Sequence, residues 1–493
     1  MTSPARTTSP ARRAAATLLA ATMALTLLAC SRPAPPSSGP DPSSASSAEA
    51  SPLASGATPP GSPDPTSSPA PTCPGGERLD RPDRTVRAAS AVTGYFAFTS
   101  PSRCATRATV QGAHAIGADT LVTFGAQLTP AAPADLRPGA DAPFDGFTVD
   151  GADGYRHAVS RTGGGSVRHV YTYGGRTTFG DAALFCPGRD GRSTTAAGVF
   201  TWWLLPVEGG YSDCDSPSRT YDLVVAFDDS GADPDALLVA DAALFGMSVY
   251  LGMPKPAPDP DVPYVADDSY TQTLGGFTSR VLADWNRKFG RSPGFAGAYQ
   301  TLETAVFTDA ATWAPNLRVY EMQHRIVGFR LPRDKQRVVV SPYADLRRGA
   351  VPVAAVRPAL QRIADTRAGV TMVLAPQDGG GTGRVGVFTP AERDEPVRAD
   401  LRGIVGDTTY EEAYAGSTAT LYAEAAAVRG VTLWANVEAF RPTGRVGDRA
   451  STDLATLDRQ VALARPRVAK VVAYRWDDYL DASGLAAEIA ARG

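Results

Sequence analysis

Short apolar runs recur along most of the chain, and segments with helical spacing separate them. Strands buried on both faces of a parallel sheet are nearly continuous apolar runs, whereas helices repeat apolar residues every three or four positions. We predict eight strands from these runs. They are Thr93–Phe98, Asp119–Gln127, Met247–Met253, Phe295–Glu303, Arg337–Tyr343, Thr371–Gln377, Thr432–Glu438 and Lys470–Trp476.

The segments between the predicted strands place their apolar residues on one helix face. One such helix carries Phe277, Val281, Leu282, Trp285 and Phe289, and three more carry similar sets. Those sets are Val356, Leu360 and Ile363; Leu421, Tyr422, Ala425 and Val428; and Leu454, Leu457 and Val461. Strands that alternate with helices in this way predict an α/β fold, the TIM (β/α)8 barrel.

A doubly wound open sheet is the alternative fold for alternating strands and helices. Such a sheet binds phosphate at a glycine-rich turn after its first strand. The corresponding part of this chain contains Gly94-Tyr95-Phe96, which is not such a turn. The barrel is therefore the preferred fold.

The spacing of the strands is regular except between the second and the third. Residues 128–232 contain Gly-rich turns, strand-like segments such as His169–Tyr173 and Tyr221–Phe227, and the pair Trp202 and Trp203. A segment this long is uncommon as a plain loop. We predict a β-rich insertion, which lies either on the C-terminal face of the barrel, where insertions shape active sites, or away from the site.

The N-terminus has the layout of an export signal. Residues 1–13 contain three arginines and no acidic residue, and Ala14–Leu28 is an apolar run too short to span a bilayer comfortably. The run ends in the sequence LLAC at Cys30, which resembles the lipobox of bacterial lipoproteins. We predict a lipoprotein signal peptide over residues 1–30 with the lipid on Cys30; an ordinary secretory signal is the alternative.

A segment rich in Ser, Pro, Ala and Gly follows the predicted lipidation site. Residues 31–72 have scarcely a charge or a large apolar side chain, so they cannot bury enough surface to offset the entropy of ordering. We predict a flexible tether that holds the next domain roughly 35 Å from its anchor. The predicted location is the extracellular face of a cell membrane.

Composition and charge limit the functions of the remaining chain. The protein has 493 residues, a formal net charge of −3 and the apolar content of a globular protein. It offers no basic surface for nucleic acid, and no later apolar run reaches the length of a membrane span. We predict one barrel domain over residues 73–493, attached to the membrane through the lipid only. The sequence indicates no oligomeric state.

Four cysteines remain after Cys30, namely Cys73, Cys104, Cys186 and Cys214. An even number in an exported protein indicates two disulfides. Proximity favours Cys73–Cys104 and Cys186–Cys214, although four cysteines allow three pairings. A metal site is disfavoured, because no Cys-x-x-Cys pair or histidine cluster accompanies them.

Two glutamates stand where predicted strands end, on the face of a TIM barrel that carries active sites. Glu303 ends the fourth strand and Glu438 ends the seventh, so both lie at one barrel mouth. Glycoside cleavage requires such a pair: a protonated acid for the leaving oxygen, and a carboxylate that attacks the anomeric carbon or activates water. Each acid singly could instead cap a helix or face solvent.

Further residues near the strand ends could bind a sugar. Aromatic rings available for stacking are Tyr95, Phe96, Trp434 and Trp476, although each could instead belong to the core. Polar side chains that could line the site or bond hydroxyl groups are Gln300, Tyr343, Gln377, Asp378, Asn436 and Asp477.

Six short segments in or near the predicted strands resemble, in their order along the chain, the motifs of a known family. They are Gly94-Tyr95-Phe96, Gly117-Ala118-Asp119-Thr120, Tyr299-Gln300-Thr301-Leu302-Glu303, Ser341-Pro342-Tyr343, Pro376-Gln377-Asp378-Gly379 and Trp434-Ala435-Asn436-Val437-Glu438-Ala439-Phe440. In that order they resemble the bacterial family called domain of unknown function 4434. The resemblance covers most of residues 92–480 apart from the insertion. It implies a TIM barrel of the glycoside hydrolase type without a settled substrate.

Glu303 and Glu438 also resemble the pair of retaining glycosidases, which place the acid/base after strand four and the nucleophile after strand seven. Those enzymes usually carry Asn directly before the strand-four Glu, where this chain has Leu302. The resemblance implies Glu438 as the nucleophile and Glu303 as the acid/base. Asp378 and Asp477 would orient sugar hydroxyls.

We therefore predict glycoside hydrolase-like action on an extracellular poly- or oligosaccharide, without a cofactor. A carbohydrate-binding surface lipoprotein without a catalytic pair is the alternative. A metal-dependent hydrolase such as a polysaccharide deacetylase is disfavoured, because its barrel would present His and Asp at strand ends. The histidines lie instead in predicted helices or in the insertion, at His114, His157, His169 and His324.

Overall fold

The structure is a computed structural model of the chain. It describes Cys73 and residues 90–136, 144–174, 178–209, 214, 218–229, 231–262, 264–443 and 448–492. The predicted signal peptide, the lipidation site Cys30 and the tether 31–72 lie outside the described residues. Within those ranges, no helix combines the length and the apolar character that crossing a bilayer requires.

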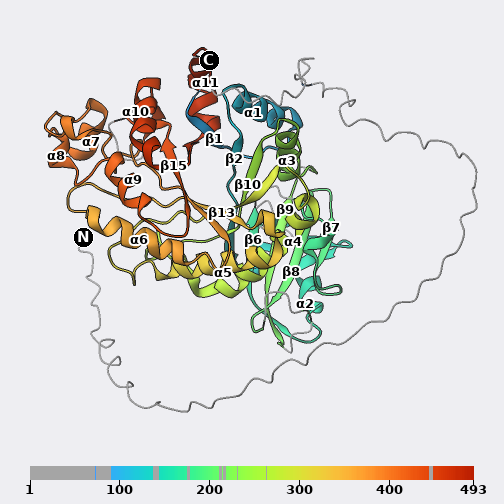
Figure 1. The fold of residues 1–493 in the computed structure, drawn as a ribbon. Helices are drawn as coiled ribbons and strands as arrows, with labels where there is room; N and C mark the ends of the chain where they lie inside the picture. The colour runs from blue at the N-terminus through green and yellow to red at the C-terminus, as the bar shows by residue number, and fades with distance from the viewer. Residues whose placement is uncertain are drawn as a thin grey trace, which may run out of the picture. The chain divides into compact units, whose positions relative to one another are not determined.

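Eight parallel strands form a closed barrel, which confirms the predicted fold (Figure 1). In order around the barrel they are β1 (Val92–Phe96), β2 (Thr120–Val122), β10 (Ser248–Gly252), β12 (Phe295–Tyr299), β13 (Arg337–Val340), β14 (Thr371–Leu374), β15 (Thr432–Glu438) and β18 (Lys470–Tyr474), and β18 pairs with β1. Each strand begins within one residue of its predicted start. All except β15 end earlier than predicted.

Helices cover the outside of the barrel. In α4 (Thr271–Phe289), Leu274, Phe277, Val281 and Trp285 recur at helical spacing and are all buried, so the sequence pattern matches the packed face. The other barrel helices are α1 (Arg103–Ala115), α3 (Pro234–Leu244), α5 (Ala314–Arg330), α6 (Val353–Asp365), α7 (Arg402–Val405), α8 (Tyr410–Ala413), α9 (Thr418–Ala426), α10 (Leu454–Ala464) and α11 (Leu485–Ala490).

Side chains fill the interior of the barrel. The ring of Phe96 on β1 lies 5.2 Å from the ring of Tyr299 on β12, and these two strands are not neighbours in the sheet. Val339, Val373 and Trp434 belong to the same buried cluster. The interior is therefore a packed core, as is usual for this fold.

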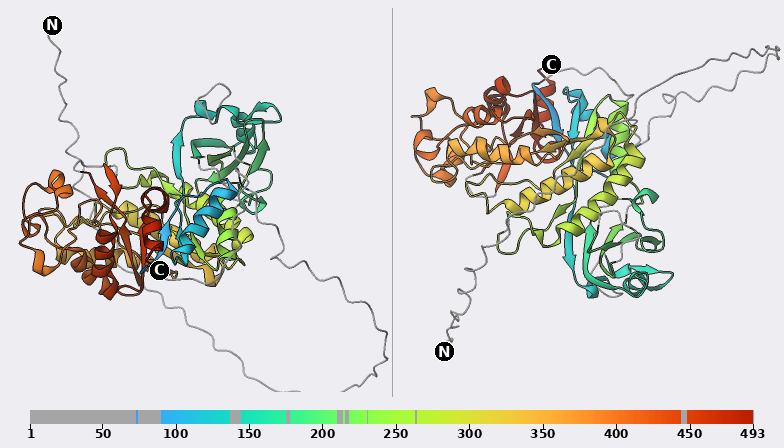
Figure 2. Two further views of the ribbon diagram at one scale, coloured as in Figure 1. Left: turned by 90° about the horizontal axis from the view of Figure 1, so that it is seen from above. Right: turned by 60° about the horizontal axis from the view of Figure 1, so that its bottom comes forward.

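The predicted insertion contains a second sheet, with the strand order β11-β3-β6-β9-β8-β7. The strands are β3 (Gln127–Ala131), β6 (Ser166–Gly174), β7 (Gly191–Thr194), β8 (Val199–Pro206), β9 (Thr220–Asp228) and β11 (Lys255–Pro256). In both views of Figure 2 this teal-to-green part projects from one side of the barrel. Since β11 follows the barrel strand β10 in the chain and pairs with β3, it joins the insertion to the barrel rim.

Alternation along β8 divides the insertion core into two layers. Trp203 packs toward α4, with its ring 5.2 Å from that of Phe277. Trp202 faces the opposite side, where Phe147 and Phe200 pack with it in a separate cluster. Both tryptophans are buried, so they form the core of the insertion and do not cover the barrel mouth.

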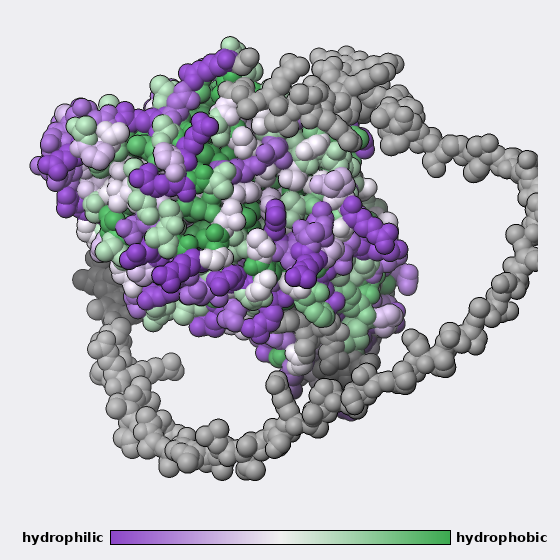
Figure 3. All heavy atoms as spheres, in the orientation of Figure 1, coloured by the Kyte–Doolittle hydropathy of each residue, from purple (hydrophilic) through white to green (hydrophobic). Residues whose placement is uncertain are grey.

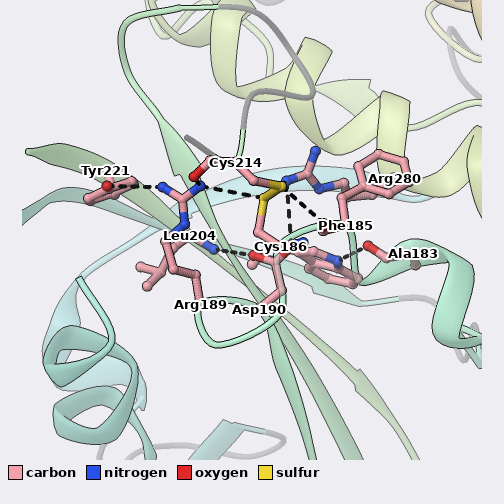
Figure 4. Close-up of a disulfide and its surroundings, with 10 residues drawn as sticks. Ala183, Phe185, Cys186, Arg189, Asp190, Leu204, Cys214, Tyr221 and Arg280 are labelled. Atoms are coloured by element: carbon pink, nitrogen blue, oxygen red, sulfur yellow. Dashed lines mark hydrogen bonds and ion pairs between the residues drawn. A yellow bond between two sulfur atoms is a disulfide. The ribbon is translucent and has the colours of Figure 1, made fainter. Parts of the chain in front are cut away.

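Two disulfides have the predicted pairing, Cys73–Cys104 and Cys186–Cys214. The second pair belongs to the insertion and lies against Arg280 of α4 (Figure 4).

Hydrophilic and hydrophobic side chains are interspersed on the face of the molecule shown in Figure 3. Such mixing is normal for a protein surface in water.

Phe277 is expected to be a main contact between the insertion and the barrel. Its ring lies 4.7 Å from Tyr173 and 5.2 Å from Trp203, and it is fully buried. Phe277→Ala should lower the free energy of unfolding, measured in urea, by about 3–5 kcal/mol. Phe329→Ala is the control, because Phe329 is 70% exposed and should change stability by less than about 0.5 kcal/mol. Equal losses would contradict this role of Phe277.

Candidate active site

The C-terminal ends of β12 and β15 bring two glutamates together. Glu438 is the last residue of β15, and Glu303 stands four residues beyond Tyr299, the last residue of β12. Both side chains line one cavity of about 150 Å³ at the barrel mouth. The structure therefore places the two predicted carboxyl groups in a single site.

A larger cavity of about 790 Å³ shares Glu303, Tyr343 and Tyr474 with the small one. Its volume is typical of ligand pockets, which are roughly 300–1,000 Å³. Gln127 and Gly174 of the insertion line it. The insertion thus borders the site through its edge.

Hydrogen bonds hold the carboxyl group of Glu303. The hydroxyl of Tyr299 donates to Oε1, and Nε2 of Gln377 donates to Oε2 at 2.8 Å. Burial raises the pKa of Glu303, whereas the two hydrogen bonds, Lys255 and Arg449 lower it, and the net direction is upward. A carboxyl group with a raised pKa keeps its proton at higher pH, as a general acid requires.

A glycine-rich loop after β14 holds the carboxylate of Glu438. The backbone amide of Thr382 donates to Oε2 at 2.7 Å. A Cβ atom on Gly381 would lie 2.5 Å from the carbonyl oxygen of Phe440 and 2.8 Å from Cβ of Glu438, so only glycine allows the loop to approach this closely. The loop therefore supplies a backbone donor at the bottom of the site.

Asp378 lies behind Glu438, and the two acids interact. Its Oδ1 accepts hydrogen bonds from the backbone amides of Gly380 at 3.1 Å and Glu438 at 3.2 Å. Burial and then the charge of Glu438 raise the pKa of Asp378 well above its usual value. Burial also raises the pKa of Glu438, but Thr382, Arg384 and Arg449 oppose this. The net direction is upward for both acids and the shift is larger for Asp378, so Asp378 holds a proton more readily than Glu438 does.

Three of the other predicted residues line the small cavity, namely Tyr343, Gln377 and Asn436. Nδ2 of Asn436 donates to Oγ of Ser341 at 2.8 Å. Its Oδ1 is buried and has no hydrogen-bond partner among the described residues. An unpaired buried acceptor is costly, so a ligand hydroxyl that reached this atom after a small shift of the cavity wall would satisfy it.

The aromatic rings predicted to stack on sugars lie elsewhere, and those predictions are wrong. Tyr95 and Trp476 are buried between the barrel and its helices, with their rings 5.3 Å apart. Phe96 and Trp434 fill the barrel interior. Trp434 precedes Glu438 by four residues, so it lies about 13 Å below the mouth along β15.

Three polar residues predicted to contact sugar also do not line either cavity. Gln300 is fully buried and donates to Gln323 of α5 at 2.7 Å. Asp477 accepts a hydrogen bond from the backbone amide of Phe98 at 2.9 Å and so fixes the loop after β1. Asp378 accepts a hydrogen bond from the backbone amide of Glu438, on the side away from the cavity. These residues support the site from outside it.

Several lining residues were not predicted. They are Thr382, Arg384, Phe440, Arg449 and Tyr474 in the small cavity, and Lys255, Phe98, Phe124 and Tyr264 in the large one. Tyr474 ends β18, so the strand-end rule that selected Glu303 and Glu438 could have found it. Arg384 and Arg449 lie beyond strand ends in segments without a periodic pattern, and no sequence signal identifies them.

The histidines lie where the sequence predicts, in helices or the insertion. His114 is in α1, His157 in the short insertion helix α2 (Gly154–Ser160), His169 in β6 and His324 in α5. Within the described ranges, no group of three His, Cys, Asp or Glu side chains is placed to hold a metal ion.

Comparison with known proteins adds little to this geometry. No model of a protein family matches the sequence, and no curated protein matches it. The resemblance to domain of unknown function 4434 therefore stays a prediction. A solved structure from Bacteroides thetaiotaomicron VPI-5482, described provisionally as an alpha-L-fucosidase, is similar with a TM-score of 0.42 and 13% identity, over 84% of this chain and 97% of that chain. A similarity of this degree carries no information about activity or substrate.

Proposed function

We propose that this protein is a glycoside hydrolase that cleaves an extracellular poly- or oligosaccharide with Glu303 and Glu438. The observation that carries the proposal is that the buried carboxyl group of Glu438 and the half-buried one of Glu303, each held by its own hydrogen bonds, line one cavity at the barrel mouth. Their environments differ, although burial raises the pKa of both. Two side chains donate hydrogen bonds to Glu303, whereas a backbone amide and two arginines oppose the shift of Glu438, and we assign the acid role to Glu303 and the nucleophile role to Glu438.

The proposed reaction has two steps. The carboxylate of Glu438 attacks the anomeric carbon while Glu303 donates its proton to the leaving oxygen. A water molecule, deprotonated by Glu303, then attacks the anomeric carbon and releases Glu438. Oδ1 of Asn436 accepts a hydrogen bond from a sugar hydroxyl, and Asp378 keeps Glu438 in position through its backbone amide.

We also propose that the enzyme works outside the cell, tethered by a lipid on Cys30. This rests on the sequence LLAC and the Ser- and Pro-rich segment 31–72 that follows it. Glycans of the cell envelope or of the surroundings are then the available substrates. Metabolic labelling with an azido fatty acid tests the anchor: the wild type should incorporate the label, and Cys30→Ser should not.

The catalytic proposal is tested by release of reducing ends from purified cell-envelope glycans. The double variant Glu303→Gln/Glu438→Gln should lower the rate by about 10⁴-fold or more, because it removes both the acid and the nucleophile. Glu321→Gln/Glu488→Gln is the matched control, since both residues are exposed glutamates on helices away from the cavities. Equal rates in wild type and the site variant would refute catalysis by this pair. Binding of glycan by the wild type without cleavage would favour a carbohydrate-binding protein.

The hydrogen bond from Gln377 to Glu303 predicts a shift in the pH profile. The amide stabilises the ionised carboxylate and so lowers the pKa of Glu303. Gln377→Ala should raise this pKa further, so the alkaline limb of kcat/KM, where the general acid loses its proton, should move to higher pH. Gln361→Ala on the outer surface of α6 should leave the profile unchanged. A limb that moves to lower pH would contradict the role of Glu303 as the acid.

A further inference from the structure

Three cations surround the paired glutamates. Arg384 and Arg449 line the small cavity, and Lys255 lines the large one beside Glu303. They come from separate parts of the chain. Arg384 follows the glycine-rich loop, Arg449 begins the short strand β17 (Arg449–Ser451), and Lys255 begins β11.

Aromatic rings, not acids, support the two guanidinium groups. Cζ of Arg384 lies 4.5 Å from the ring centroid of Tyr343, and Cζ of Arg449 lies 4.6 Å from that of Phe440. Within the described ranges, neither arginine, nor Lys255, has a carboxylate oxygen within 4.0 Å. Elsewhere arginines near acids form close pairs, such as Arg398 with Asp400 at 2.8 Å. The two guanidinium groups are thus held by aromatic rings, and no described carboxylate forms a close pair with them, although Glu438 feels their charge.

The charges of the site do not balance without a ligand. When Glu303 holds its proton for the first step, Glu438 is the anion that faces the small cavity, and three cations line the two cavities. A cavity with an excess of one sign attracts ligands of the opposite sign. A neutral sugar would remove water from the guanidinium groups without supplying an acceptor of matching charge, which is unfavourable. A carboxylate or a sulfate fits a guanidinium fork with two hydrogen bonds.

The large cavity has room and surface for further sugar rings. Its volume is about five times that of the small cavity, at about 790 Å³ against 150 Å³. Phe98 and Tyr264, which are 48% and 53% exposed, both line it. Exposed aromatic surface in a hollow is typical of a binding site, and the flat apolar faces of sugar rings can stack on it.

We propose that the substrate is an anionic glycan whose sugar-borne carboxylate or sulfate groups bind Arg384 and Arg449 in the small cavity, with further rings along Phe98 and Tyr264. This inference rests on the proposed glycosidase function of the same site. Arg384 and Arg449 are then specificity residues, because they bind the acidic group of the sugar and not the bond that breaks. Lys255 contacts an acidic group farther along the chain.

Binding measurements with defined polymers test the inference apart from catalysis. The full chain in mild detergent is titrated with polygalacturonate, alginate, hyaluronan and chondroitin sulfate, and with neutral dextran and xylan. At least one anionic polymer should bind at least tenfold more tightly than either neutral one. Carboxyl reduction and chemical desulfation of the bound polymer identify which acidic group is recognised, and removal of that group should weaken binding at least tenfold.

The arginines are tested by Arg384→Gln/Arg449→Gln, which should weaken binding of the anionic polymer at least tenfold and leave neutral polymers unaffected. Arg325→Gln/Arg362→Gln is the control, since it removes two charges from the exposed faces of α5 and α6. The inference is overturned if no anionic polymer binds, if neutral polymers bind as tightly, or if the site variant binds like the control. Release of reducing ends is followed in parallel. Arginine-dependent binding without release would refute the catalytic proposal alone, and release from neutral glycan only would refute this inference alone.

Discussion

Replacing Glu438 by alanine is expected to lower turnover by about 10⁴-fold or more, and added azide is expected to restore part of it. The truncation removes the carboxylate that Thr382 holds at 2.7 Å and leaves space for a small anion in the same place. Azide would then attack the anomeric carbon directly, from the face opposite the leaving group. The product should be a glycosyl azide with inverted configuration, which NMR of the product measures.

Glu303→Ala provides the contrast that separates the two roles. Loss of a general acid costs about 10²–10⁴-fold for a substrate with a poor leaving group. The loss should be much smaller for an aryl glycoside of the same sugar, because its leaving group needs no proton. Azide should intercept the glycosyl-enzyme and give the retained configuration. The reverse pattern of azide products would exchange the roles of Glu303 and Glu438, and full activity of Glu438→Ala would refute the nucleophile.

The starts of the barrel strands were predictable, whereas their ends were not. The apolar runs that begin at or next to Phe295, Thr371 and Lys470 each follow a segment with helical spacing and a short turn, so their starts stand out in the sequence. Beyond the last strand residues the chain stays largely buried, as at Gln300 and Leu302, but the side chain of Gln300 and the carbonyl oxygen of Leu302 bond to helix α5. A run of apolar residues indicates that a segment is buried, but it does not show whether that segment is a strand or a buried loop at the barrel mouth.

The misplaced aromatic residues have a related cause. Alternation along β1 indicates that Tyr95 and Phe96 face opposite sides, but both sides of a barrel strand are buried. Sequence alone therefore cannot say that Tyr95 faces the helices and Phe96 faces the interior. The depth of a side chain is also not predictable from the sequence. Trp434 faces the barrel interior, as Glu438 does, but it lies too far below the mouth to contact a ligand there.

The positively charged residues of the site could not be predicted from the pattern of strands. Arg384, Arg449 and Lys255 meet only because a glycine-rich loop, the short strand β17 and the strand β11 converge on one mouth. Their spacing in sequence carries no period. The carboxylates were predictable because the barrel fixes where strands end, whereas the cations depend on loop conformation, which tertiary contacts determine.

Removing the guanidinium group of Arg280 is expected to lower the free energy of unfolding by about 3–5 kcal/mol, because a buried acid loses its partner. Arg280 of α4 is fully buried, with Nη2 3.5 Å from Oδ2 of Asp190 and Cζ 4.3 Å from the ring of Phe185 (Figure 4). Asp190 is also fully buried and accepts hydrogen bonds from the backbone amides of Leu204 and Cys186. Arg280→Met fills similar space without the charge.

The loss should depend on pH in a defined direction. Burial raises the pKa of Asp190, and Arg280 lowers it, so Arg280→Met should raise it further. An acid whose folded pKa lies above its unfolded value loses stability as pH rises, because the unfolded chain ionises more easily. Urea unfolding under non-reducing conditions should therefore show a larger loss in Arg280→Met at pH 8 than at pH 5.

A second variant distinguishes the unpaired charge from lost packing. Leu204 donates to Oδ1 of Asp190 and Cys186 donates to Oδ2, so Arg280→Met/Asp190→Asn keeps an oxygen acceptor for one of the two amides and removes the charge. It should abolish the pH dependence and recover part of the loss at pH 8. Arg325→Met on the exposed face of α5 should change stability by less than about 0.5 kcal/mol. If Arg280→Met and the double variant were equally unstable and neither showed a pH dependence, the stacking of Arg280 on Phe185 would account for the loss. The contact between the insertion and α4 would then depend on packing at this point, as it does at Phe277, and not on charge.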